Sequence, residues 1–388
     1  MSTKHIPLNR RAHARDPHET HRASTPLELF FDLVFVVAIA SAGSQLHHGL
    51  SGGHPELILG FVMSFMAIWL AWMNYSWYAS AYDSDDVVFR LITFVIMIGA
   101  LVFAAGIPDM FADAQSTAGV EGYVIMRLGM VALWVRAAMH NPDRRRTALT
   151  YAFGITFAQG LWVLRLLICP TEWLIPTFFM TFALELLVPV IAERQGHTPF
   201  HAEHMAERYS LLTIIVLGEE ILGVMASVQA AFATGLPERF GLFLIGALLM
   251  VFSAWWWYFS GDSSSLVTGR KSRWAFGYGH LLTFGSLAAT GSTMSSAVDV
   301  MLGESAAPPR TILIVLACCL IVFGCTSTAL HLVRNRDWGV AVLIAVVATA
   351  VLLLAVLVPS IAVAVLLMGS AMAIGLVVQI VRAGRLAT

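Results

Sequence analysis

Apolar residues in this chain come in runs of about 20, the length that a helix needs to cross a bilayer, and they do not alternate with polar residues as in surface strands. The connections are short and rich in Gly, Pro, Ser and charged residues, so none of them can fold as a separate domain. The last two runs meet at Pro359, which predicts a tight helical hairpin. The predicted membrane-spanning helices cover residues 27–49, 56–80, 87–108, 120–140, 147–168, 172–192, 206–232, 239–260, 274–297, 311–333, 338–357 and 359–382.

Composition agrees with this pattern. The chain is 58% hydrophobic and 12% charged, whereas about 25% of the residues of a typical soluble domain are charged. The predicted fold class is therefore an all-α polytopic membrane protein of about twelve transmembrane helices. With 23 Lys and Arg against 24 Asp and Glu, the chain lacks the positive charge of a nucleic-acid binder.

Basic residues predict the orientation, because cytoplasmic segments of membrane proteins carry an excess of Lys and Arg. With the N-terminus inside, 19 of the 23 basic residues fall on the inner side or in inner helix halves. We therefore expect a multi-pass protein of the bacterial cytoplasmic (inner) membrane with both termini in the cytoplasm. The four outer exceptions are Arg127, Arg165, Arg239 and Arg310, of which Arg127 and Arg165 are interpreted as structural side chains that extend toward the interface.

Local sequence matches predict an internal repeat. Residues 77–80 (WYAS) match residues 257–260 (WYFS), and three further matches and a pair of prolines follow the same order at offsets of 179 to 191 residues. The predicted organisation is two parallel six-helix repeats, a plan known from transporters. The expected segments are a cytoplasmic tail (1–26), the first repeat (27–193), a cytoplasmic linker (194–205) and the second repeat (206–388).

Carboxylates within or at the ends of spans are the main candidates for chemistry, because charge is costly in a membrane and is usually functional there. Glu28 and Asp32 share a helix face near the start of the first span, where helix-start or interfacial acids are the structural alternative. Glu219 and Glu220 lie at membrane depth and are candidates for a proton or cation site, Glu219 being preferred. A structural hydrogen bond is the alternative for both of them. Glu207 and Glu185 complete the group.

Counter-charges are expected from Arg90 and its repeat partner His280, in an inner polar layer with the acids. Trp77 and Trp257 belong to aromatic groups, interpreted mainly as an interfacial belt, with a stacked ligand as the alternative. The acidic group Asp83, Asp85 and Asp86 is interpreted as a solvated loop. The His201–Glu207 segment does not have the spacing of a metal site on one helix face, and no cofactor, metal or catalytic motif is predicted.

Two segments resemble the signatures of the bacterial low temperature requirement protein A (LtrA) family. They are TPLELFFDLVF at residues 25–35, and HMAERY at 204–209 followed by VLGEEIL at 216–222. The resemblance covers nearly the whole chain and implies a polytopic inner-membrane protein linked by name to cold adaptation, without an assigned activity. It adds His204 and Arg208 to the candidate residues and strengthens Glu28, Asp32, Glu207 and Glu219.

These observations favour a secondary transporter with a proton- or cation-responsive carboxylate site and a small-molecule or ion substrate. One alternative is a membrane enzyme acting on a lipid or lipid-linked substrate at the cytoplasmic interface. The other is a non-catalytic structural or stress-response protein, in which every buried carboxylate is paired. The expected partners are membrane lipid and the transported solute. The sequence does not define the oligomeric state or the substrate.

Overall fold

The computed structural model describes residues 6–17, 19, 22–261, 264–269, 272–335 and 337–387, and every regular element among them is helical. Residues 1–5, 18, 20 and 21 of the predicted tail lie outside this part of the chain. The long helices are α1 (Pro26–Ser51), α2 (Ile58–Tyr82), α3 (Val87–Ala105), α5 (Thr117–His140), α6 (Arg145–Ile168), α7 (Leu174–Ala192), α8 (Ala202–Thr234), α9 (Phe240–Phe259), α11 (Ser272–Leu302), α12 (Pro309–Asn335), α13 (Trp338–Leu357) and α14 (Ile361–Ala387). The short elements are α4 (Ile107–Asp113), α10 (Ser264–Thr268) and the 3₁₀ turns η1 (Pro55–Leu57), η2 (Pro142–Arg144) and η3 (Thr171–Trp173).

The long helices occupy the positions of all the predicted spans, and the chain is an all-α polytopic membrane protein. Within the described residues, 11 helices are long and apolar enough to cross a membrane. The exception among the long helices is α11, which has 31 residues but a series of buried Ser and Thr side chains that lower its hydropathy. The hairpin at Pro359 is confirmed, since α13 ends at Leu357 and α14 begins at Ile361.

Short polar side chains determine where several helices begin. Asp86 precedes α3 and accepts a hydrogen bond from the backbone N–H of Phe89 at 2.8 Å, and Ser116 does the same for Gly119 at the start of α5, at 3.0 Å. These N-caps satisfy donors that the first turn of a helix leaves free. They explain why the apolar runs become helical at these residues.

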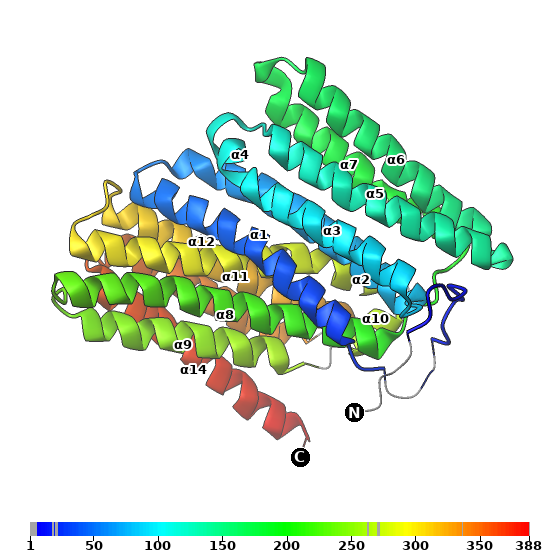
Figure 1. Ribbon diagram of the computed structural model, residues 1–388. Helices are drawn as coiled ribbons and strands as arrows, with labels where there is room; N and C mark the ends of the chain where they lie inside the picture. Colours follow the sequence, from blue (N-terminus) through cyan, green and yellow to red (C-terminus); the bar gives the residue numbers. More distant parts are fainter. Residues whose placement is uncertain are drawn as a thin grey trace. The chain divides into compact units, whose positions relative to one another are not determined.

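By their internal contacts, the described residues divide into two compact units. Unit 1 consists of residues 1–42 and 59–209, and within it α3 packs on α5, α5 on α6 and α6 on α7 (Figure 1). The approach of α3 to α5 is close: a Cβ atom at Gly122 would lie 2.2 Å from the backbone N of Phe103. Glycine at this position lets two helix backbones come into direct contact, as is common in membrane helix pairs.

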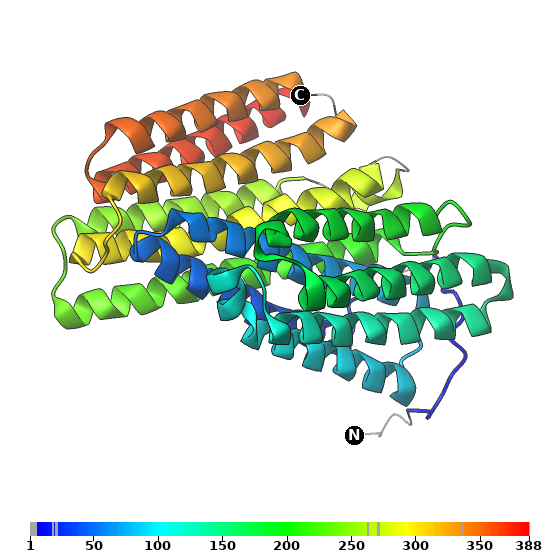
Figure 2. The same ribbon diagram turned by 90° about the horizontal axis from the view of Figure 1, so that it is seen from above.

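Unit 2 consists of residues 43–58 and 210–388. Here α11 packs on α12, α12 on α13 and α13 on α14, and α9 lies along α14 (Figure 2). Gly246 allows the last contact, because a Cβ atom there would lie 2.5 Å from the backbone N of Leu366. As in unit 1, four successive long helices, α11 to α14, pack in the order of the chain. The units divide inside α1 and α8 and not at residues 193 and 206, and the two-repeat organisation itself stays a prediction.

The N-terminal segment is packed against unit 1, which the sequence pattern did not predict. Ala12 is only 1% exposed, and its backbone N–H donates to His140 Nδ1 at 3.2 Å. The next contact is from the Ala14 N–H to Asn141 Oδ1, at 2.8 Å. These contacts hold the segment at the ends of α2, α3 and α5.

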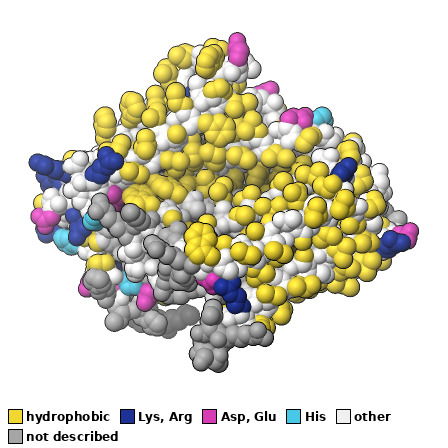
Figure 3. Space-filling model, turned by 180° about the vertical axis from the view of Figure 1, so that it is seen from behind, with side chains coloured by type: hydrophobic (Ala, Val, Ile, Leu, Met, Phe, Trp, Pro, Cys, Tyr) yellow, Lys and Arg dark blue, Asp and Glu magenta, His cyan; other side chains and the backbone are white. Residues whose placement is uncertain are grey.

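Apolar side chains cover the outer faces of several helices, as expected of surfaces in contact with lipid. Phe153 of α6 is 74% exposed, Leu91 of α3 is 56% exposed and Val342 of α13 is 64% exposed. On the face drawn in Figure 3, hydrophobic side chains predominate, and the few charged ones lie toward its margins.

Candidate functional site

The site begins at the first turn of α1, where Glu28 forms a capping box with Thr25. The Thr25 hydroxyl oxygen accepts the backbone N–H of Glu28 at 3.2 Å, and the Glu28 carboxylate accepts the backbone N–H of Thr25 at 2.9 Å. Asp32 follows one turn later on the same face of the helix. Neither carboxylate has any exposed surface, so helix capping accounts for only part of their environment.

Two basic residues on α8 have the same spacing as these acids. His204 Nε2 lies 3.2 Å from Glu28 Oε1, and Arg208 Nη2 lies 2.6 Å from Asp32 Oδ1. Both basic side chains are also fully buried. We call Glu28, Asp32, His204 and Arg208 the ion-pair ladder, because they form two successive contacts between an acidic and a basic side chain, from α1 to α8 within unit 1.

Helix α2 supplies the third wall of the ladder. Trp72 Nε1–H donates to Asp32 Oδ1 at 2.7 Å, and the Ser76 hydroxyl accepts from Arg208 Nη2 at 3.3 Å. The ring of Trp72 also packs edge-on against Tyr209, with centroids 4.9 Å apart. These contacts hold the Asp32–Arg208 pair in one geometry and exclude lipid from it.

The ladder has more polar atoms than its own contacts satisfy. Among the described residues, Asp32 Oδ2, His204 Nδ1 and the Nε and Nη1 atoms of Arg208 are buried without a hydrogen-bond partner. Buried polar atoms normally find partners, and those that do not are frequently associated with function. The ladder therefore has spare donors and acceptors that a proton, an ion or water can use.

Two further candidate residues lie at the edge of the ladder. Glu207 is partly buried and accepts the backbone N–H of Ser24 at 3.3 Å. Trp77 Nε1–H donates to the hydroxyl of Tyr209 at 3.1 Å, and its ring packs against Phe200. Glu207 thus joins α8 to the segment before α1, and Trp77 joins α2 to α8. None of these contacts involves a carboxylate of the ladder.

A different arrangement surrounds Glu220 in unit 2. Its side chain is 5% exposed, and among the described residues its carboxylate makes no hydrogen bond and no ion pair. Its neighbour Glu219 is only partly buried. The structure thus places Glu220, and not the preferred Glu219, in the protein interior.

Helix α11 packs closely against Glu220. A Cβ atom at Gly291 would lie 2.7 Å from Glu220 Cγ and 2.8 Å from its Cα, so only glycine allows this approach. One turn along α8, a Cβ atom at Gly223 would lie 3.6 Å from the hydroxyl oxygen of Ser295. Since the Ser295 hydroxyl donates within α11, to the carbonyl of Gly291 at 3.3 Å, its lone pairs can still accept a hydrogen bond or coordinate a cation.

Comparisons with known proteins agree with the sequence resemblance. The family model described as bacterial low temperature requirement A protein (LtrA) matches residues 23–379. The chain belongs to this family. It is also 27% identical over 302 residues to an uncharacterized protein of Rhizobium meliloti (strain 1021), an alignment that covers 73% of this chain and 71% of that one.

The two LtrA-like sequence signatures meet in the structure. The residues that resemble the first signature supply the acids of the ladder, and HMAERY supplies its bases. The GEE part of the second signature follows on α8 at residues 218–220 and contains Glu220, 12 residues after Arg208. The family resemblance therefore singles out both the paired and the unpaired carboxylates.

Glu185 does not join the ladder, and the predicted inner layer is wrong in this respect. Its carboxylate lies 2.7 Å from Arg127 Nη2 and accepts from Tyr123 and Trp162 at 2.9 and 3.1 Å. Arg127 is 1% exposed and Arg165 is 6% exposed. The interpretation of these arginines as side chains extending to the interface is therefore also wrong, because each finds polar partners inside unit 1.

The predicted counter-charges have other partners as well. Arg90 contacts the exposed Asp85 at 2.6 Å, outside the ladder. His280 is buried in unit 2 and contacts the Tyr258 hydroxyl at 2.9 Å and the carbonyl of Phe276 at 2.7 Å. The bases that face Glu28 and Asp32 are instead His204 and Arg208. Periodicity shows which residues share one helix face, but not which helix packs against it.

The aromatic belt is only partly present. Trp255 and Trp256 are 46% and 52% exposed, as an interfacial position requires, whereas Trp72 is fully buried and donates to Asp32. Trp257 is also buried and lines an apolar pocket with residues such as Ile344 and Met372. Sequence reasoning missed Trp72 and Ser76 as site residues. A Trp and a Ser one turn apart in a very apolar span were the available signal.

The acidic loop between α2 and α3 is not simply solvated. Asp86 is buried, forms an ion pair with Arg136 and accepts the backbone N–H groups of Phe89 and Arg10. Burial acts to raise its pKa, but these hydrogen bonds outweigh burial and the net pKa is lowered. For Asp83, burial and the nearby Glu28 carboxylate raise the pKa from 3.8 to about 6. Two acids of one loop thus have opposite shifts.

Proposed function

We propose that the chain is a secondary transporter of the bacterial inner membrane, with both termini in the cytoplasm, in which Glu220 binds the coupling proton or cation. The observation that carries the proposal is a membrane-depth carboxylate, 5% exposed, with no ionic or hydrogen-bond partner among the described residues. A carboxylate in such a place is neutralised by a proton or by a bound cation, because an unpaired charge is too costly there.

Neighbouring groups support a site that can exchange its occupant. The Ser295 hydroxyl lies close to the same face of α8, and the Glu220 side chain rests on the bare backbone of Gly291. Oxygen ligands of this kind suit a proton or a small hard cation. The site therefore offers one negative charge, with the Ser295 oxygen near Gly223, one helical turn further along α8, so that a change of occupant changes the local charge.

The ion-pair ladder supplies the second part of the proposal. Opposite charges on α1 and α8 hold the two helices together while both pairs are intact, and the Glu28–His204 pair weakens when Glu28 gains a proton or His204 loses one. Because His204 and Glu220 lie on one continuous helix, α8, a shift of α8 would affect both. In this mechanism the ladder holds α1 and α8 together only in one protonation state of Glu28 and His204.

A non-catalytic structural role is the second candidate. It is favoured by the pairing of Asp32 and Glu185, each with a buried arginine, and by the contact of Glu28 with the buried His204. Glu220 is the residue that distinguishes the two functions, since a purely structural protein gains nothing from an unpaired carboxylate at that depth.

The first test measures occupancy of Glu220 without knowledge of the substrate. Purified protein is treated with dicyclohexylcarbodiimide, which reacts with protonated carboxyl groups in apolar surroundings, and modification is mapped by mass spectrometry. We expect Glu220 to be labelled, with labelling reduced as the pH rises or, for a cation site, as Na⁺ is added. Glu219 serves as the internal control, because its partly exposed carboxylate is expected to react far less.

The second test measures transport. Proteoliposomes containing wild type, Glu220→Gln or Glu219→Gln are screened with a solute panel under imposed pH and Na⁺ gradients. We expect gradient-driven flux in wild type and Glu219→Gln and at least a tenfold loss in Glu220→Gln. Flux that is independent of Glu220, or no flux with any solute and gradient together with an unlabelled Glu220, would contradict the proposal and favour the structural role.

A further inference from the structure

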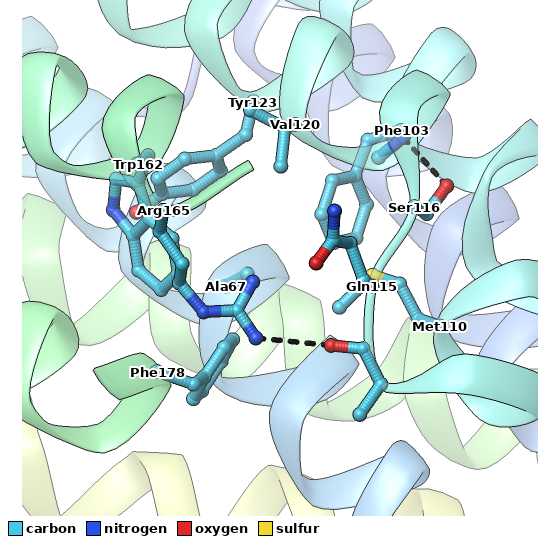
Figure 4. A pocket seen from close by; sticks show the side chains of 12 residues that line it. Ala67, Phe103, Met110, Gln115, Ser116, Val120, Tyr123, Trp162, Arg165 and Phe178 are labelled. Atoms are coloured by element: carbon cyan, nitrogen blue, oxygen red, sulfur yellow. Dashed lines mark hydrogen bonds between the residues drawn. The ribbon is translucent and has the colours of Figure 1, made fainter. Parts of the chain in front are cut away.

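A separate pocket lies in unit 1, where α6 ends and α5 and α7 begin (Figure 4). The empty space at this pocket amounts to about 390 Å³, a volume that includes space open to the surroundings. Four aromatic rings and two polar side chains dominate its lining: Phe103, Tyr123, Trp162, Phe178, Arg165 and Gln115. We call it the Arg165 pocket. Neither the ladder nor Glu220 contributes to it.

The guanidinium of Arg165 is held firmly in place. Its Nε–H and one Nη2–H donate to the carbonyl of Leu174 at 3.2 and 2.7 Å, and Nη2 also donates to the carbonyl of Ala114 at 3.0 Å. Its Cζ atom lies 5.9 Å from the ring centroid of Trp162 and 5.8 Å from that of Phe178. A charged group fixed in this way needs no rearrangement to bind a ligand.

Among the described residues, this buried cation has no anionic partner. Arg165 is 6% exposed, and no carboxylate among the described residues lies within ion-pair distance of it. Its Nη1 atom donates to none of these residues, and Figure 4 shows the guanidinium turned toward the middle of the pocket. Buried charges are normally paired, and guanidinium binds carboxylates especially well. The pocket therefore has a place for one anionic group.

Gln115 supplies a second, different contact. Its Nε2–H donates to the carbonyl of Leu166 at 3.1 Å, which fixes the orientation of the amide. The Oε1 atom is left as an acceptor at the pocket, where Figure 4 shows the Gln115 side chain across from Arg165. An acceptor selects a ligand that carries a hydrogen-bond donor besides its negative charge.

The aromatic wall is anchored from behind. The Tyr123 hydroxyl and the Trp162 indole N–H both donate to Glu185, whose charge is balanced by Arg127. The rings therefore present carbon surfaces to the pocket and keep their polar atoms turned to Glu185. Together with Arg165 and Gln115 they line the pocket, and we therefore consider ligands with a short carbon chain.

We propose that the Arg165 pocket binds a small hydroxycarboxylate of two or three carbons. Its carboxylate accepts from Arg165 Nη1, its hydroxyl donates to Gln115 Oε1, and its carbon atoms contact Trp162 and Phe178. The site stands on these contacts alone and does not depend on Glu220 or on transport.

The test is isothermal titration calorimetry of the full chain in detergent. The probes are lactate, propionate, which lacks the hydroxyl, and 1,2-propanediol, which lacks the carboxylate. We expect lactate to bind about tenfold more tightly than propionate, the difference one good hydrogen bond makes, and propanediol not to bind. Sodium chloride is titrated separately to detect a site for any small anion.

Variants locate the binding. Arg165→Gln is expected to weaken lactate binding at least tenfold, and Val120→Trp to abolish it by filling the pocket while leaving Arg165 in place. Gln115→Leu should bring lactate down to the affinity of propionate. Val163→Trp, the same change at a 38% exposed position on α6, is the matched control and should bind lactate normally.

Several results would overturn the proposal. They are equal binding of lactate and propanediol, equal binding of lactate and propionate to wild type, unchanged lactate binding by Val120→Trp, chloride binding without carboxylate binding, or no binding of any probe. Since Val120→Trp retains the contacts of Arg165, misfolding of Arg165→Gln alone does not decide the question.

Discussion

Buried carboxylates in the two units differ in whether they have a cationic partner. In unit 1, Asp32 lies 2.6 Å from Arg208 and Glu185 lies 2.7 Å from Arg127, and all four side chains are at most 1% exposed. In unit 2, Glu220 is buried to a similar degree, yet it has no cationic partner among the described residues. A buried pair is held together by the cost of separating its charges, whereas a lone acid must acquire its neutralising charge from outside.

The difference indicates that paired and unpaired carboxylates have different roles in this protein. Paired acids fix helices relative to one another within unit 1, and removal of either partner leaves an uncompensated charge. An unpaired acid such as Glu220 contributes little to the stability of the fold, so its presence is better explained by the binding of a proton or a cation. The predictions below test this contrast, beginning with the change that is expected to be largest.

Asp32→Ala should be the most destabilising change, since it leaves the fully buried Arg208 without its carboxylate. We expect a loss of about 3–5 kcal/mol in the free energy of unfolding, seen as a large fall in the thermal midpoint by size-exclusion analysis of heated, detergent-solubilised protein. The double variant Asp32→Leu/Arg208→Met removes both charges and should recover much of this loss. A double variant as unstable as the single one would show that the charge pair is not what holds these helices.

Gly291→Ala tests the close contact between α11 and Glu220. Its new Cβ atom would lie 2.8 Å from Glu220 Cα, a backbone atom that cannot move alone. Overpacking of this kind costs about 1–3 kcal/mol, measured by the same thermal assay. Gly218→Ala is the matched control on α8, because no atom lies within 4 Å of its new Cβ. If both variants behave alike, Glu220 does not pack tightly against α11.

Asp83→Asn tests, on a smaller scale, an acid whose burial outweighs the contacts that favour its charge. Burial raises the pKa of Asp83 to about 6 in the folded state, so the folded protein resists its ionisation. The resulting destabilisation is absent below pH 4, grows between pH 4 and 6, and is complete above pH 6. Asp83→Asn should therefore stabilise the protein by about 1–2 kcal/mol at pH 7.5, after allowance for partial exposure, and have little effect near pH 4.

The control for this prediction is Asp86, whose pKa is lowered by Arg136 and two backbone N–H groups despite its burial. Its stabilising effect is present above pH 4 and is lost only as the pH falls through its lowered pKa. Asp86→Asn should therefore destabilise the protein at pH 7.5, opposite in sign to Asp83→Asn. Thermal midpoints of both variants from pH 4 to 8 would reveal an error in either sign.

Glu220→Gln should have the smallest effect on stability, less than about 1 kcal/mol in either direction, because the wild-type carboxylate has no partner to lose. Its thermal midpoint is compared with those of wild type and Glu219→Gln. A loss similar to that of Asp32→Ala would mean that Glu220 is held by a strong contact and would remove the contrast between the two units.

Much of the site could be read from the sequence one helix at a time. The spacing of Glu28 and Asp32 placed them on one face, and the family resemblance added His204 and Arg208. The pairing was not predicted, since Arg90 and His280 were chosen as partners by their depth in the membrane. Depth restricts the candidates to one layer, but the contact depends on which helices are neighbours and on how each is rotated about its axis.

The same limit applies to the neighbouring carboxylates Glu219 and Glu220. Adjacent residues on a helix point about 100° apart, so the sequence showed that they face different surroundings but not which of them is buried. The close approach at Gly291 buries Glu220. Nor did the sequence indicate that Arg165 points into a pocket, because an arginine near a helix end is usually expected to reach the interface.

By itself, the sequence determined the class of the protein, the positions of its helices and the short set of polar residues that matter, because the bilayer imposes a length and a polarity on every span. Tertiary structure alone decided the partners: His204 with Glu28, Arg208 with Asp32, Arg127 with Glu185, and none for Glu220 or Arg165 among the acids and bases that the structure describes. The physical reason is that burial within a helix is a local property, whereas neutralising a buried charge requires a side chain from another helix.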